Sequence, residues 1–164
     1  MNKLEGKEQL EKTGDIFGEQ LSEGERIQKE GEESDRIAAS IDTSGLDSDT
    51  IEAARQVESD LSGAFSEQIE EVEEKVEQTA ETVQGNVESL GESKEKVDEN
   101  AEKYSEMSGV SEIGRAAADS GRSKMESDSQ EYSDLIQENE RQMELSRERA
   151  KNMSSVVKGL FKRS

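Results

Sequence analysis

The side chains of this sequence that are capable of chemistry are almost all carboxylates. The chain has 41 Asp and Glu residues against 21 Lys and Arg residues, with no His and no Cys. It therefore lacks a side chain whose ordinary pKa lies near neutrality and lacks a thiolate nucleophile, which removes the usual catalytic dyads and triads. Disulfides and zinc-finger spacing are excluded as well. Only paired carboxylates remain as candidates for acid–base or metal chemistry.

The densest acidic cluster consists of Glu70, Glu71, Glu73, Glu74 and Glu77. Carboxylates act as a general acid–base pair only inside a pocket that moves their pKa values apart. Three Phe and two Tyr residues are few for building such a pocket. The cluster is not spaced as an EF-hand, and no nucleotide-binding glycine motif is present. We therefore interpret it as the outer face of a helix and expect no catalytic residue, no cofactor and no metal site.

The basic residues gather near the end of the chain. Arg147, Arg149, Lys151, Lys158, Lys162 and Arg163 lie there, against Glu148 as the one acidic residue. Together with Val156, Val157, Leu160 and Phe161 they form a short basic amphipathic segment, a type that can bind anionic membrane surfaces. The alternative, which we favour, is that this tail packs on the fold and neutralises acidic neighbours. Nucleic-acid binding is opposed by the net charge of −20.

These charges must be positioned by helices, because the apolar residues of the middle of the chain follow a helical period. From Leu61 to Tyr104 they recur in steps of three and four, with a mean of about 3.6 and with Lys94 as the polar exception. A helix of this length must bury its narrow stripe against other helices. The predicted core and partner-binding residues of this stripe are Leu61, Phe65, Ile69, Val72, Val76, Val83, Val87, Leu90, Val97 and Tyr104.

Two clusters of turn residues divide the sequence into three arms. In the first, Gly45 suits the position after one helix, and Asp47 or Ser48 suits the N-cap of the next. In the second, Gly109 is followed by Ser111 as a cap. We predict one domain with a glycine-interrupted N-terminal arm, a long central helix and a C-terminal arm with a basic tail, spanning residues 1–44, 45–107 and 108–164. The helices are predicted at 3–41, 48–107 and 111–161. A second hinge at Gly114 and Gly121 is the alternative to an unbroken last helix.

The two outer arms carry weaker stripes. The C-terminal arm contributes Ile136, Met143, Met153, Val157 and Leu160 to the predicted core, on a heptad that also includes Tyr132, Asn139, Ser146 and Ala150. Asn139 either sets the register of the seam or is simply solvated, and we favour solvation. The N-terminal arm places Phe17, Leu21, Ile27, Ile37 and Ile41 on a stripe that Gly14, Gly18, Gly24 and Gly31 interrupt. These glycines indicate local mobility or a close approach of helices, and we favour mobility.

The predicted fold is all-α, a long antiparallel helical hairpin or coiled coil with a third, N-terminal helix packed at one end. Folding the arms back at their turns places residues 147–158 beside about 60–71 and residues 17–41 beside about 48–72. Hydrophobic residues make up only 29% of the chain. A coiled coil suits this composition because its seam needs few apolar residues, whereas the high charge favours disorder as the alternative.

The arrangement of a long helix, a short glycine-containing turn and a second long helix in a small, acidic, Cys-free chain resembles the helical hairpins of the WXG100 and LXG families. It also resembles the small helical partners of LXG toxins in type VII secretion. The resemblance covers residues 48–161. A Trp-x-Gly motif is absent, Leu61-Ser62-Gly63 lies within the predicted central helix, and the Tyr-x-x-x-Asp/Glu signal is missing. The resemblance implies a bacterial adaptor or targeting partner of an exported protein.

We therefore expect a non-catalytic helical module that binds another helical protein or a second copy of itself. A self-associating coiled-coil scaffold and a conditionally folded protectant, like the hydrophilic proteins of desiccation, are the alternatives. The sequence has no apolar run long enough to span a membrane, and its first residues do not form a cleavable signal peptide. The expected location is the cytoplasm, or outside the cell after export by another route.

Overall fold

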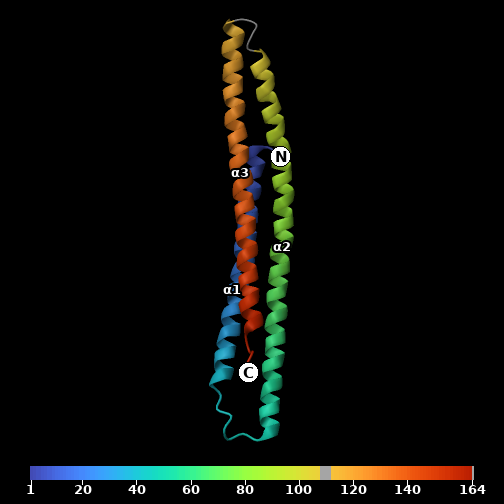
Figure 1. Cartoon of the computed structure of the whole chain (residues 1–164), viewed down its shortest axis with the longest axis vertical. Coiled ribbons are helices and arrows are strands. Elements are labelled where there is room, and N and C mark those ends of the chain that lie inside the picture. Colours follow the sequence, from blue (N-terminus) through green and yellow to red (C-terminus); the bar gives the residue numbers. More distant parts are fainter. Residues whose placement is uncertain (108–111, 164) are drawn as a thin grey trace. The chain divides into compact units, whose positions relative to one another are not determined.

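The computed structural model describes residues 1–107 and 112–163, and its regular elements there are three α-helices. Helix α1 spans Lys3–Ser40, α2 spans Ser48–Glu106 and α3 spans Glu112–Gly159 (Figure 1). The predicted all-α class with three mutually packed helices is confirmed. The predicted Gly109 turn and Ser111 cap lie outside the described residues.

Side chains cap the N-termini of the first two helices. At α1 the Asn2 side-chain oxygen accepts from the Glu5 backbone N–H at 2.9 Å, and the Glu5 carboxylate accepts from the Asn2 N–H at 3.0 Å. This reciprocal pair is a capping box, which satisfies backbone N–H groups that the helix leaves without partners. At α2 the Asp47 carboxylate accepts from the Thr50 N–H at 2.7 Å. Asp47 is thus the N-cap, one of the two residues predicted for that position.

The connection between α1 and α2 differs from the prediction at Gly45. Helix α1 ends at Ser40, whose hydroxyl donates to the Ile37 carbonyl at 2.7 Å, so that carbonyl is satisfied without a glycine. Gly45 lies instead in a turn closed by the Leu46 N–H, which donates to the Thr43 carbonyl at 3.1 Å. The prediction that Gly45 follows the helix directly was wrong because the connection is long enough to contain a turn of its own.

Helix α3 is continuous through Gly114 and Gly121, as predicted for the last helix, and this excludes the alternative of a second hinge there. A methyl group at Gly121 would lie 2.7 Å from the Tyr104 ring, so this glycine lets the ring of Tyr104 pack against the backbone of α3. The helix ends at Gly159, and Phe161 takes a left-handed conformation with φ 61°. That conformation is uncommon for a non-glycine residue. Phe161 adopts it while its ring stacks on Phe65, with centroids 6.2 Å apart.

The chain divides into two compact units. The first consists of Met1–Asp15 and Ala80–Glu144. Its core is built on Leu90, Tyr132 and Leu135, each 7% exposed or less. Four partly buried apolar residues pack against these three, namely Met1, Leu10, Val97 and Ile136.

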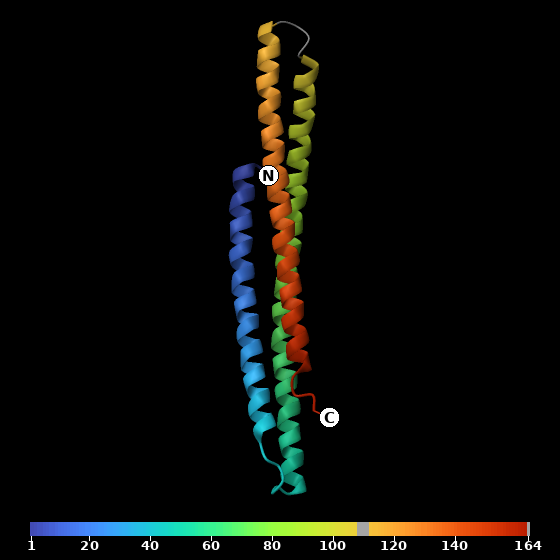
Figure 2. The same ribbon diagram turned by 60° about the vertical axis from the view of Figure 1, so that its left-hand side comes forward.

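Contacts within the first unit set the helix directions. Lys3 pairs with Asp128 at 2.6 Å and Thr13 lies 3.2 Å from Gln142, so α1 and α3 run parallel. Past the start of α1, α2 and α3 continue as an antiparallel pair (Figure 2). There Ser129 donates a hydrogen bond to Asp98, which also pairs with Lys94 at 2.7 Å. The bonds from Lys94 and Ser129 lower the pKa of Asp98. Lys94, the polar exception in the predicted stripe, is thus paired with an acidic residue.

The second unit consists of Ile16–Thr79 and Leu145–Ser164. Its core residues come from all three helices and are Phe17, Leu21, Ile27, Ile69, Val72, Val76, Ala150, Met153 and Val157. Arg147 pairs with Glu77, and Lys158 pairs with Glu70 at 3.0 Å. Residues 147–158 thus lie beside 70–77 rather than 60–71. Exposed ion pairs contribute only about 0–1 kcal/mol, so they follow the register of the apolar seam and do not set it.

Helix α1 also pairs further along α2 than predicted. Gln20 donates to the Thr79 hydroxyl at 2.9 Å, and a methyl group at Gly31 would lie 3.6 Å from the Phe65 ring. Residues 17–41 therefore face α2 from the high fifties to the high seventies, instead of residues 48–72. The shift means that the connection, residues 41–47, does not reverse the chain symmetrically about residues 44 and 45.

Apart from Gly18, the glycines of α1 serve close helix approach, the alternative that we did not favour. Besides the buried Leu21, a strict heptad of α1 positions faces the other helices, and each of these positions is buried or half-buried. They are Gly6, Leu10, Thr13, Phe17, Gln20, Gly24, Ile27, Gly31, Ser34 and Ala38. A methyl group would lie 2.8 Å from Leu90 at Gly6 and 2.8 Å from Leu160 at Gly31. Large side chains of α2 and α3 thus fill the space that these glycines leave.

Two glycines of α1 offer a matched test. A methyl group at Gly18 has open space, whereas at Gly24 it would lie 2.7 Å from Met153 and 3.3 Å from Val72. Gly18→Ala should raise the free energy of unfolding by about 0.5–1 kcal/mol through helix propensity. In Gly24→Ala the same gain in the free energy of unfolding should be offset by steric crowding against Met153 and Val72. Urea unfolding of both variants measures the difference, and an equal gain at both positions would contradict the packing role of Gly24.

Asn139 is buried, which corrects the solvated interpretation. It is 1% exposed, and its amide donates to the Leu135 carbonyl at 2.7 Å. Its side-chain oxygen has no hydrogen-bond partner among the described residues. The side chain faces the seam because the heptad of α3 places position 139 there, one turn from Leu135. A buried side-chain oxygen without a hydrogen-bond partner lowers the free energy of unfolding. The packing of the helices is therefore less stable here than it would be with an apolar residue at position 139.

Candidate interaction site

The predicted stripe forms the interior of the fold. Among its members Ile69, Val72, Val76, Val83 and Leu90 are 3% exposed or less. Met143, Met153 and Val157 of the C-terminal arm are also buried. The remaining members are half-buried, namely Leu61, Phe65, Val87, Val97, Tyr104, Ile136 and Leu160. The chain's own helices thus contact this stripe within each unit, and surface available to a partner has to be sought elsewhere.

Three core residues were missed in the sequence. Leu135 is 7% exposed, Ala118 is 5% exposed and Ala80 is fully buried. Leu135 lies beside Ile136, which the predicted core contains, so the buried face of α3 is wider than a single line at every third or fourth position. The signal at Leu135 was available, since this residue lies one helical turn before Asn139.

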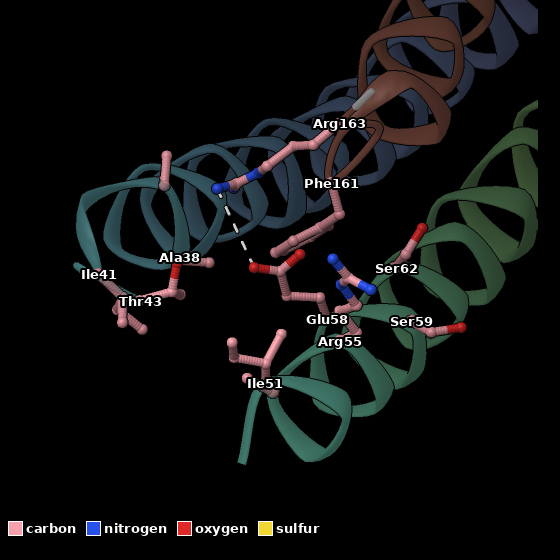
Figure 3. A pocket seen from close by; sticks show the side chains of 12 residues that line it. Ala38, Ile41, Thr43, Ile51, Arg55, Glu58, Ser59, Ser62, Phe161 and Arg163 are labelled. Atoms are coloured by element: carbon pink, nitrogen blue, oxygen red, sulfur yellow. Dashed lines mark ion pairs between the residues drawn. The ribbon is translucent and has the colours of Figure 1, made fainter. Parts of the chain in front are cut away.

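An open groove lies in the second unit, where α1 and α2 continue past the end of α3 (Figure 3). We call it the terminal groove. It encloses about 800 Å³. Small and aliphatic residues form much of its wall, and two arginines and one glutamate add charge. The lining residues are Ala38, Ala39, Ile41, Thr43, Ile51, Ala54, Arg55, Glu58, Ser59, Ser62, Phe161 and Arg163.

The C-terminal tail forms the inner end of the terminal groove. Arg163 donates to the Asp35 carboxylate at 2.6 Å and to the Asp35 carbonyl at 2.7 Å, and it lies 4.0 Å from Glu58. The Phe161 backbone N–H also donates to Asp35 at 3.2 Å. Figure 3 shows Phe161 and Arg163 above the α2 residues of the groove. The favoured prediction that the basic tail packs on acidic neighbours agrees with these contacts.

Apolar side chains remain exposed around the terminal groove. Ile37 is 59% exposed, Ile41 is 54% exposed and Val57 is 58% exposed. Ile37 and Ile41 had been assigned to the buried stripe of the N-terminal arm, and this was wrong. Position 38 continues the α1 heptad, so residue 37 lies beside the seam, and residue 41 comes after the helix end. Because neither Ile37 nor Ile41 lies on the heptad of α1, the sequence itself indicates that both side chains are exposed.

The acidic cluster of α2 is partly paired and partly exposed. Glu70 pairs with Lys158, and Glu77 accepts two hydrogen bonds from Arg147, one of them at 2.9 Å. The Arg147 guanidinium lowers the pKa of Glu77. Glu71 and Glu74 face solvent. No group of three or more acidic, His or Cys side chains is placed to hold a metal ion within the residues that the structure describes.

Comparison with known proteins gives no relative: no family model, curated protein or solved structure matches the chain. Within residues 1–107 and 112–163 no helix combines the length and the apolar character that crossing a bilayer requires.

Proposed function

We propose that this chain is a non-catalytic helical interaction module that binds another helical protein through the terminal groove. The observation that carries the proposal is the end of α3 at Gly159, while α1 continues to Ser40 and α2 begins at Ser48. Within the described residues, no third helix packs on these two there, as one does elsewhere in the same unit. A helix from a partner can take that place, as amphipathic helices do in apolar grooves.

Exposed aliphatic residues beside the groove support this proposal. Ile41 and Ile51 line it, and Ile37 and Val57 are exposed close by in sequence. Single exposed hydrophobic residues are ordinary, whereas a group of them close together indicates an interface. The resemblance to secretion-associated hairpins makes an adaptor or targeting partner of an exported bacterial protein the specific form of this proposal.

A photo-crosslinking amino acid at position 54 tests the proposal. Ala54 lines the groove, whereas its neighbour Ala53 is exposed and does not. We expect a discrete hetero-adduct from position 54 in the source cells and none from position 53. The captured protein, identified by mass spectrometry and purified, should bind the unmodified chain and should lose binding to Ala54→Trp.

The pattern of adducts separates the alternatives. An adduct of twice the chain's own mass would favour the self-associating scaffold and overturn the hetero-complex. Equal labelling from positions 53 and 54, or no adduct from either, would remove the terminal groove as the binding surface.

A further inference from the structure

The surroundings of the terminal groove are strongly acidic. Between residues 41 and 62 the chain has six acidic residues and one basic residue, Arg55. Asp42, Asp47 and Glu52 are exposed. The backbone N–H of Ser44 lowers the pKa of Asp42, and the side chain and backbone of Thr50 lower the pKa of Asp47. Asp42 and Asp47 are therefore charged at neutral pH, beside a groove whose wall combines small and aliphatic side chains with polar ones.

Glu52 belongs to the same surface as the groove. A neighbouring hollow is lined by Ser48, Ile51, Glu52, Arg55 and Gln56, and it shares Ile51 and Arg55 with the terminal groove. A ligand that extends from the groove along α2 would meet the Glu52 carboxylate. Arg55 and Arg163 are the positive charges of the groove lining, and Arg163 is paired with Asp35. The sum of the nearby charges, rather than each charge, therefore favours an occupant with several cations.

The chain itself shows which chemical groups this end of the unit binds. The tail that closes the inner end of the groove contains Lys162 and Arg163 directly after Leu160 and Phe161. Its aromatic ring stacks on Phe65, and its guanidinium bonds to Asp35. An apolar group followed by a cation is thus the combination already accommodated there. The outer part of the groove offers Ile41 and Ile51 for apolar contact, with acidic residues close by in sequence.

We infer that the terminal groove binds a cationic amphipathic helix of a partner protein, with its apolar face between Ala38 and Ala54 and its lysines or arginines toward Asp42, Asp47 and Glu52. This inference rests on the proposed function and adds the chemistry of the partner. The small side chains at positions 38, 54 and 62 let a helix backbone approach closely. The part of α1 beyond Gly31 is about 13 Å long, at a rise of about 1.5 Å per residue, which matches two to three helical turns of an occupant.

Two synthetic peptides test the inference on the full chain. One is a short amphipathic helix of leucine and lysine, and the other is the same peptide with glutamate in place of every lysine. We expect the lysine peptide to shift the methyl NMR signals of Ile41 and Ile51, and the glutamate peptide to leave them unchanged. Equal binding of both peptides in the groove would overturn the cationic partner while leaving the groove, and so the proposed function, in place.

Matched variants locate the binding and its charge dependence. Ala54→Trp fills the groove and should weaken the lysine peptide at least about tenfold, whereas Ala53→Trp should not. Glu52→Lys should weaken it several-fold more than Glu81→Lys, the same change at another exposed position of α2. Ala38→Trp replaces Ala54→Trp if the helical circular dichroism of the latter departs from wild type. Equal effects within each pair would show general attraction to an acidic protein and would overturn the site.

Discussion

Ile69→Asp should lower the free energy of unfolding by several kcal/mol, enough to unfold a large fraction of the chain at room temperature. Ile69 is fully buried in the second unit. An aspartate there would be ionised without a partner in an apolar setting, or would have to take up a proton to enter it, and both states are costly. Because single domains are stable by only about 5–15 kcal/mol, one such change removes much of the total.

Urea unfolding followed by circular dichroism measures this effect. Gln68→Asp is the matched control, since Gln68 is the preceding residue and is exposed. We expect the free energy of unfolding of this control to stay within about 0.5 kcal/mol of wild type. Glu73 belongs to the acidic cluster that we predicted on the outer face of the helix. It is less suitable as a control because it is half-buried and lines a hollow with Arg147 and Lys151. Equal tolerance of aspartate at 68 and 69 would refute the buried assignment of α2.

Phe17→Ala should cost about 3–5 kcal/mol, the usual range for removing a buried aromatic side chain. Phe17 is 2% exposed and is the largest apolar residue that α1 places in the seam. Leu21, one helical turn further on, is also buried, whereas the heptad neighbours Thr13, Gln20 and Gly24 bury little apolar area. The loss of this one ring should therefore remove a large share of the energy that holds α1 on the other helices.

Ile37→Ala is the control for Phe17→Ala. It truncates an apolar side chain of the same helix, but Ile37 is 59% exposed. We expect a cost below about 1 kcal/mol, measured by the same urea titration. A comparable loss of stability from the two variants would mean that α1 does not pack through the heptad that contains Phe17.

The long central helix could be predicted from the sequence because its apolar residues keep one period over many turns. Helix α2 spans Ser48–Glu106, within a residue of the predicted end, and its N-cap is Asp47. The predicted members of its stripe, Leu61 through Tyr104, are all buried or half-buried. A long periodic segment specifies both the helix and its inner face, since each added turn repeats the same requirement.

The pairing of the helices and the terminal groove could not be predicted in the same way. Register depends on how far each connection extends before the next helix begins, and the residues of a loop do not fix that length. The glycines of α1 were read as weak points because helix propensity treats them as a cost. Their use appears only when Leu90, Met153 and Leu160 occupy the space beside them. The groove arises because α1 and α2 continue past the end of α3. Such a difference depends on how the helices pair, which the sequence of one segment does not predict.

The composition of the α1 seam has a consequence for the order in which the fold opens. A helix that presents Gly6, Gly24 and Gly31 inward contributes few side-chain atoms of its own at those levels, so separating it exposes mainly the side chains of its neighbours. Local opening follows the elements with the least apolar area to lose. Deuterium should therefore enter the amides of α1 before those of the central stretch of α2, and a protease acting on the native protein should cut first within α1.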